Sequence, residues 1–141
     1  MTTISGSCLC GAVTYEADCE IQLVFNCHCL DCQKATGSVH TTVLFVPEKA
    51  VKIRGYPSSY THMADSGATM VKRFCSSCGS QLFSLNSRRP GVMGIRAGTV
   101  SQKHLVKPQV NVYCDSAVAS TPMDDKLPRH AKMPRHAKMP G

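Results

Sequence analysis

The 141-residue chain contains no tryptophan and only eight phenylalanine and tyrosine residues. Its apolar residues form no run that approaches the roughly 20 residues of a membrane-spanning helix. The residues after Met1 also lack the basic and apolar regions of a signal peptide. We therefore expect a single cytoplasmic domain that does not enter a membrane. Because a core with few large rings buries little area per residue, we also expect cross-links to support it.

Helical periodicity is nearly absent too, apart from a short stretch at 30–36 that is followed by Gly37. Short runs rich in β-branched and aromatic residues instead alternate with turn residues. This pattern predicts a mainly β domain of antiparallel strands. The expected strands are 12–17, 21–25, 39–46, 50–54, 58–62, 69–74, 81–85, 91–97 and 109–113.

Positive charge is spread thinly along the chain, although the formal net charge is +7. Residues 1–120 carry 11 Lys and Arg against 7 Asp and Glu, and residues 121–141 carry 5 against 2. The basic residues are scattered and lack interleaved aromatic rings on which bases could stack. Nucleic acid is therefore not an expected partner. Such a role would require a contiguous basic face and binding that weakens steeply with salt.

The last residues differ in character from the rest of the chain. The sequence PRHAKM at 128–133 recurs at 134–139. Because a short repeat with proline has no apolar face to bury, we predict a flexible tail over 121–141, following a zinc-binding β domain over 1–120. A basic docking arm is the alternative.

Nine cysteines in a chain without a secretory signal favour metal binding or thiol chemistry over disulfides. Seven of them fall in three clusters: Cys8 and Cys10, then Cys27, Cys29 and Cys32, then Cys75 and Cys78. The other two, Cys19 and Cys114, have no partner motif, and we expect them to be small buried apolar residues.

Spacing alone leaves two ways to build a four-thiolate zinc site on the third cluster. Cys29 and Cys32 of the second cluster could complete it, and so could the first cluster. If the first cluster completes the site, the whole second cluster remains as three possible ligands within six residues. A zinc ion with three protein ligands keeps its fourth position open, which is typical of catalytic sites.

Around these clusters, the sequence resembles the glutathione-dependent formaldehyde-activating enzyme family, which includes the centromere protein V domain. The resemblance covers most of residues 5–113, and its three clusters match in order and internal spacing. The family usually has a histidine near its last strand, where this chain has Asn111. The matching segments are SCLCGAV at 7–13, NCHCLDCQKATGS at 26–38, RFCSSCGS at 73–80 and AGTV at 97–100.

This resemblance implies a β-tent fold of several small antiparallel sheets stapled by zinc. It implies a carbon–sulfur lyase that joins a small-molecule thiol, glutathione, to the aldehyde formaldehyde to give S-hydroxymethylglutathione. It further implies two zinc ions per chain, the second of them the more labile. Cys8, Cys10, Cys75 and Cys78 match the structural zinc ligands, and Cys27, Cys29 and Cys32 match the catalytic ones. A non-catalytic zinc module that binds a protein or another partner is the alternative.

Three cations are candidates to hold the carboxylates of glutathione, namely Lys34, Arg73 and Arg96, with a solvated surface role as the alternative. His28 lies between two proposed ligands, and we expect its ring to point away from the metal, with ligation or proton shuttling as alternatives. Asp31 is expected to cap the short helix. Three further histidines are expected to be ordinary polar residues: His40, His62 and His104.

Overall fold

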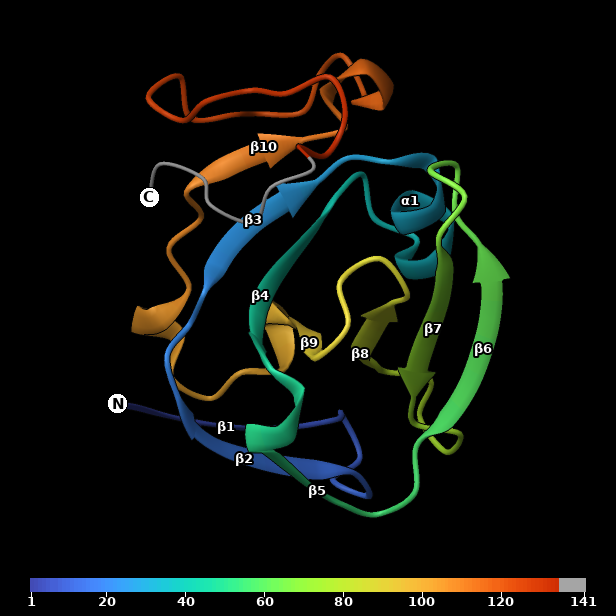
Figure 1. The fold of residues 1–141 in the computed structure, drawn as a ribbon, viewed down its shortest axis with the longest axis vertical. Helices are drawn as coiled ribbons and strands as arrows, with labels where there is room; N and C mark the ends of the chain where they lie inside the picture. The colour runs from blue at the N-terminus through green and yellow to red at the C-terminus, as the bar shows by residue number, and fades with distance from the viewer. Residues whose placement is uncertain (135–141) are drawn as a thin grey trace.

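The computed structural model describes residues 1–134. Within them, ten strands form two sheets, one with the order β1-β2-β5 and one with the order β10-β3-β4-β9-β8-β7-β6 (Figure 1). Neighbouring strands pair antiparallel, except that β10 pairs parallel with β3. The prediction of a mainly β domain is confirmed.

The smaller sheet consists of β1 (Thr2–Ser7), β2 (Thr14–Cys19) and β5 (Val51–Arg54). The larger sheet consists of β3 (Leu23–Cys27), β4 (Thr41–Pro47), β6 (Ser58–Met63), β7 (Thr69–Phe74), β8 (Gln81–Asn86), β9 (Val92–Arg96) and β10 (Val110–Val112). The helices are α1 (Leu30–Thr36), η1 (Glu48–Ala50), η2 (Ala97–Thr99), η3 (Lys103–Leu105) and η4 (Cys114–Ser116). None of the helices among residues 1–134 has the length and apolarity needed to cross a bilayer.

The first strand is the one that the sequence pattern did not predict. Ile4 is the only large apolar residue of β1, so the period of two that marks a half-buried strand is hard to detect. The strand is defined by its pairing with β2, which runs in unbroken register from Thr2 opposite Cys19 to Ser7 opposite Thr14. Every other strand overlaps a predicted range.

The one α-helix among residues 1–134 begins and ends at residues that satisfy its free backbone groups. Cys29 is the N-cap, and its sulfur accepts a hydrogen bond from the backbone N–H of Cys32 at 3.2 Å. At the other end, Gly37 adopts a φ of 73° and donates its N–H to the carbonyl oxygen of Gln33 at 2.8 Å. The prediction that Asp31 caps this helix is wrong, because Asp31 lies inside the first turn.

The two faces of the larger sheet have different roles because side chains alternate along each strand. Leu44 of β4 and Ile95 of β9 are buried in the main hydrophobic core, which also contains Ile4 and Tyr15 of the smaller sheet. The larger sheet is strongly curved (Figure 1). On its opposite face, every strand of this sheet contributes a residue to the lining of a cavity. The sheet therefore separates the main core from the cavity.

Gly94 lies at the centre of that cavity-facing surface. It is paired with Phe45 of β4 on one side and with Ser84 of β8 on the other. A Cβ atom at this position would lie 2.6 Å from the Ser84 hydroxyl oxygen and 2.9 Å from Cγ1 of Val43. Glycine at this position thus leaves room for the side chains of Ser84 and Val43 from the neighbouring strands.

The described part of the C-terminal segment lies against β10. The N–H of Asn111 donates to the carbonyl oxygen of Pro128 at 2.9 Å, and the N–H of His130 donates back to Asn111 at 2.9 Å. The pattern of the repeat did not predict these hydrogen bonds, and the flexibility of residues 121–141 stays a prediction. Main-chain hydrogen bonds hold the segment although the repeat has no apolar face. The second copy of the repeat lies outside the described residues from 135 onward.

Candidate metal centres and the adjoining cavity

Four cysteines from two distant turns meet at one point. We call Cys8, Cys10, Cys75 and Cys78 the quartet; their sulfur atoms all lie within 4.8 Å of one another. The Sγ–Sγ distance is 3.7 Å both between Cys8 and Cys10 and between Cys10 and Cys75. A tetrahedral zinc ion with Zn–S bonds of about 2.3 Å places its sulfurs about 3.8 Å apart. The donor atoms and their spacing therefore fit zinc.

Tight backbone turns orient the sulfurs of the quartet toward one another. The Cys75–Cys78 segment forms the turn between β7 and β8, where the N–H of Gly79 donates to the carbonyl oxygen of Cys75 at 2.8 Å. The Ser80 hydroxyl lies 3.3 Å from the sulfur of Cys78, and together with nearby backbone N–H groups it lowers the pKa of that thiol to about 5. Spacing left two ways to complete this four-cysteine site. In the structure, the first cluster, Cys8 and Cys10, completes it.

Three further cysteines form a second group, which we call the trio: Cys27, Cys29 and Cys32. Their sulfurs also lie within 4.8 Å of one another. Cys27 ends β3, Cys29 caps α1 and Cys32 lies in the first turn of α1, so the strand end and the helix start gather the ligands locally. Cys27 and Cys32 are buried, whereas Cys29 is half-buried.

The trio is an electrostatically coupled group. Interactions with the thiols of Cys27 and Cys32 lower the pKa of Cys29, while the interaction with Cys29 raises the pKa of Cys27 well above its usual value. One negative charge is therefore favoured among the three sulfurs and further ones are opposed. A divalent cation at their centre would remove that opposition, and zinc accepts thiolate ligands of this kind.

All three sulfur-bearing residues of the trio line a cavity of about 570 Å³, a size typical of small-ligand sites. No residue of the quartet lines it. Apolar side chains form part of the wall, and they include Phe25, Val43, Phe45, Val112 and Met133. Basic side chains form another part: Lys72, Arg88, Arg89 and Arg96. Within the described part of the chain, two carboxylates line the cavity, those of Asp31 and Asp65.

Of the three cations expected at the substrate site, the structure places Arg96 at the cavity. Arg96 is only 6% exposed, and its guanidinium donates over long distances, 3.5 Å to Oγ1 of Thr41 and 3.4 Å to Oε1 of Gln81. Lys34 is exposed on α1 and does not line the cavity. Arg73 is absent from the lining as well, because the face of β7 that meets the cavity carries its neighbour Lys72 together with Met70.

Sequence reasoning missed several charged and titratable residues in the cavity wall, among them Lys72 on β7 and His62 on β6. His62 was expected to be an ordinary polar residue. The available signal was alternation, because Met70 and Lys72 share one face of the predicted strand at 69–74. The sequence does not say which face of that strand meets the cavity, since this depends on how the whole sheet curves.

His28 lies in sequence between two members of the trio, but its ring points toward Asn111. The ring is buried, and its Nε2 lies 2.9 Å from Oδ1 of Asn111, to which it donates in the Nε2–H tautomer. The backbone N–H of His28 also donates to the carbonyl oxygen of Val112 at 3.1 Å. These two bonds attach the loop that carries the trio to β10. Outside both metal centres, Cys19 is buried as expected and Cys114 is half-buried.

Comparisons with known proteins agree with this geometry. A family model described as "Glutathione-dependent formaldehyde-activating enzyme" matches residues 3–116, a range that contains the quartet and the trio. A search of curated proteins found no match. Among solved structures, the chain is similar to a crystal structure of a Rhodobacter sphaeroides protein, with a TM-score of 0.58 and 18% sequence identity. That alignment covers 74% of this chain and 96% of the other, and at this identity it supports the fold alone.

Proposed function

The chain belongs to the glutathione-dependent formaldehyde-activating enzyme family, and from that premise we propose that it is a zinc-dependent carbon–sulfur lyase. Its reaction joins the thiol of glutathione to formaldehyde, or to another small aldehyde. The observation that carries this proposal is the position of the trio, three sulfurs in the wall of a cavity of about 570 Å³. In the same proposal, the quartet holds a structural zinc ion and the trio holds the catalytic one.

The donor sets support these two roles. Four thiolates saturate a tetrahedral zinc ion, whereas three leave one position for a substrate. A zinc ion bound at the trio supplies a strong preference for the thiolate form of an incoming thiol, which makes the sulfur nucleophilic at neutral pH. The nine cysteines form no disulfide, which fits a reducing compartment such as the cytoplasm.

The remaining wall of the cavity suits an anionic tripeptide. Four basic side chains line it against two carboxylates, and Asp65 lies 3.6 Å from the Nζ atom of Lys132. In this proposal Arg96 and Arg89 hold carboxylates of glutathione, and the support is that each lines the cavity without a carboxylate partner among residues 1–134. The apolar side chains of Phe25 and Phe45 belong to the same wall, and the guanidinium of Arg89 lies over the Phe45 ring, 5.4 Å from its centroid. A zinc module that only binds another protein would need no such cavity beside its metal.

The proposal is tested by zinc content and by adduct formation. We expect two zinc ions per chain, and we expect the zinc-loaded protein to accelerate exchange of isotope-labelled formaldehyde onto glutathione above the spontaneous rate. Cys29→Ser removes one ligand of the trio and should leave one zinc ion and no acceleration. Cys114→Ser, which changes a cysteine outside both centres, should keep both zinc ions and the full rate. A Cys29→Ser protein with two zinc ions and the full rate would overturn the proposal.

A further inference from the structure

A buried lysine faces the same cavity as the trio. Lys72 is 5% exposed, and among residues 1–134 no carboxylate lies within ion-pair distance of its amine. A buried cation without a counter-ion is costly, and burial accordingly lowers the pKa of Lys72. A carboxylate of glutathione could pair with this amine. A negative charge that develops near the amine during the reaction could pair with it equally well. The position of the amine decides between these roles.

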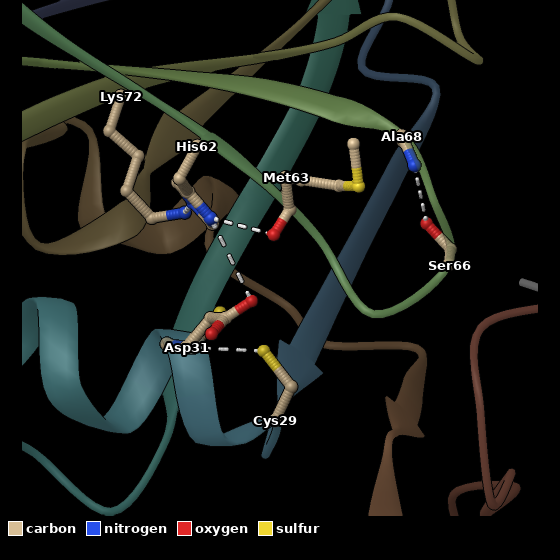
Figure 2. A network of polar contacts seen from close by, with 8 residues as sticks. Cys29, Asp31, His62, Met63, Ser66, Ala68 and Lys72 are labelled. Atoms are coloured by element: carbon tan, nitrogen blue, oxygen red, sulfur yellow. Dashed lines mark hydrogen bonds and ion pairs between the residues drawn. The ribbon is translucent and has the colours of Figure 1, made fainter.

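That position is set by a second side chain, His62. The Nζ atom of Lys72 lies 2.6 Å from Nε2 of His62, and a protonated amine can only donate, so Nε2 accepts. The proton of the imidazole is thereby assigned to Nδ1, which faces the carbonyl oxygen of Met63 at 3.3 Å and Oδ2 of Asp31 at 4.0 Å. Figure 2 shows the histidine lying between Lys72 and Asp31.

The chain of groups also connects the cavity to solvent and to the trio. Asp31 is half-exposed, lies in the first turn of α1 and stands in sequence between Cys29 and Cys32. Figure 2 shows Cys29 beside it. The charged and titratable groups that act on Lys72 are these two cysteines, Asp31 and the other buried cation, Arg96. The amine therefore lines the same cavity as the sulfurs and feels their charge, and His62 lies between it and the half-exposed Asp31.

From this arrangement we propose that Lys72 is a catalytic residue and that His62 positions it; the inference rests on the proposed function. The substrate sulfur forms a bond to the aldehyde carbon, and the π electrons of the C=O bond move onto the oxygen. The ammonium of Lys72 donates a hydrogen bond to that oxygen and then transfers a proton to it, which gives the hydroxyl of the hemithioacetal. Solvent returns a proton to the amine, and the thiol proton has already left for solvent.

A group that stabilises charge developing in the transition state changes kcat, whereas a group that only holds a substrate carboxylate changes KM. In the zinc-loaded protein, we expect Lys72→Met to lower kcat about 100-fold or more, with little change in KM for glutathione. Lys72→Arg should recover part of the loss, because it keeps a cationic donor but does not release its proton. Lys52→Met, an exposed lysine of the smaller sheet, is the matched control and should leave kcat unchanged.

His62 gives a second, independent pair of variants. His62→Leu removes the acceptor that holds the amine and should lower kcat, while His62→Gln keeps an acceptor oxygen and should restore part of it. Zinc content and calorimetric binding of S-methylglutathione, which cannot react, should stay at wild-type levels in all these proteins. The inference is overturned if Lys72→Met and His62→Leu keep the wild-type kcat, or if their loss lies in KM and in S-methylglutathione affinity. A wild-type protein that fails to accelerate adduct formation overturns the proposed function itself, a separate result.

Discussion

The quartet and the trio offer the same ligand atom in different surroundings. The quartet joins turns whose cysteines are up to 70 positions apart in numbering, and Cys10 within it is exposed. The trio comes from one segment of six residues between the end of β3 and the first turn of α1, is mostly buried and faces a cavity. A closed set of four sulfurs can only hold segments together, whereas an incomplete set beside a cavity leaves room for a substrate. The number of ligands and the adjoining space, and not the residue type, distinguish the two centres.

Breaking the quartet should have the largest effect. Cys75→Ser removes its most buried sulfur and with it the link between the β1–β2 and β7–β8 turns. Metal binding contributes about 10–16 kcal/mol of apparent free energy at structural zinc sites, more than a small domain has to spare. We expect no cooperative unfolding transition by circular dichroism. A variant that melts at the wild-type temperature would show that the quartet does not support the fold.

Breaking the trio should spare the fold. Cys32→Ser is expected to remove one zinc ion and the activity, while its unfolding transition stays cooperative, because the quartet and the main core lie elsewhere. Zinc analysis together with thermal denaturation compares this variant directly with Cys75→Ser. Equal loss of folding in both variants would erase the distinction between the two centres.

A smaller effect is expected from Asn111→Leu, which removes the acceptor of the buried His28 ring. An unpaired buried donor costs about 1–3 kcal/mol, so the free energy of unfolding measured in urea should fall by that amount. Because the same contact attaches the loop of the trio, metal affinity at the trio should also fall about 10–100-fold. Competition with a chelator measures this affinity, and the zinc ion of the quartet serves as the internal control.

Gly94→Ala adds a methyl group between Ser84 and Val43 on the cavity face. Overpacking of this kind costs about 1–3 kcal/mol, and we expect a lower free energy of unfolding together with a higher KM. Gly98→Ala is a matched control, because a Cβ at that glycine meets no atom within 4 Å. Two variants of equal stability and equal KM would show that the cavity is not crowded at Gly94.

The smallest effect should come from the C-terminal segment. Met133 is half-buried, packs near the trio and lines the cavity. Met133→Ala should lower the free energy of unfolding by about 1 kcal/mol, since it removes part of an apolar contact. The number of zinc ions should stay at two. Urea denaturation and zinc analysis check both statements, and loss of a zinc ion would show that the segment supports a metal centre.

Much of the fold was accessible from local patterns. The period of two and the turn residues predicted nine of the ten strands, and the bounds of α1 at 30 and 36 match because Gly37 ends it. β1 was not predicted because Ile4 is its only large apolar residue. The contact of residues 128–131 with β10 and the residues after it was not predicted, because it is made by main-chain hydrogen bonds, which do not depend on the side chains.

The cysteine clusters were visible because ligands must be close and of a particular type, so their spacing carries information. The cavity wall was not visible in the same way. Lys72 and Arg73 are neighbours in sequence, and a shift of one residue in a strand moves a side chain to the opposite face. Which of them faces the trio depends on the curvature of seven strands, and no local pattern records that curvature.

The central claim is that the trio holds a metal ion with one position open to a thiol from the cavity. Cobalt-loaded protein tests it directly, because each thiolate bound to cobalt adds sulfur-to-metal charge-transfer absorption. Titration with glutathione should raise this absorption and saturate at one thiol per chain, while S-methylglutathione should leave it unchanged. A spectrum that does not respond to glutathione, or one that responds equally in Cys29→Ser, would contradict the account.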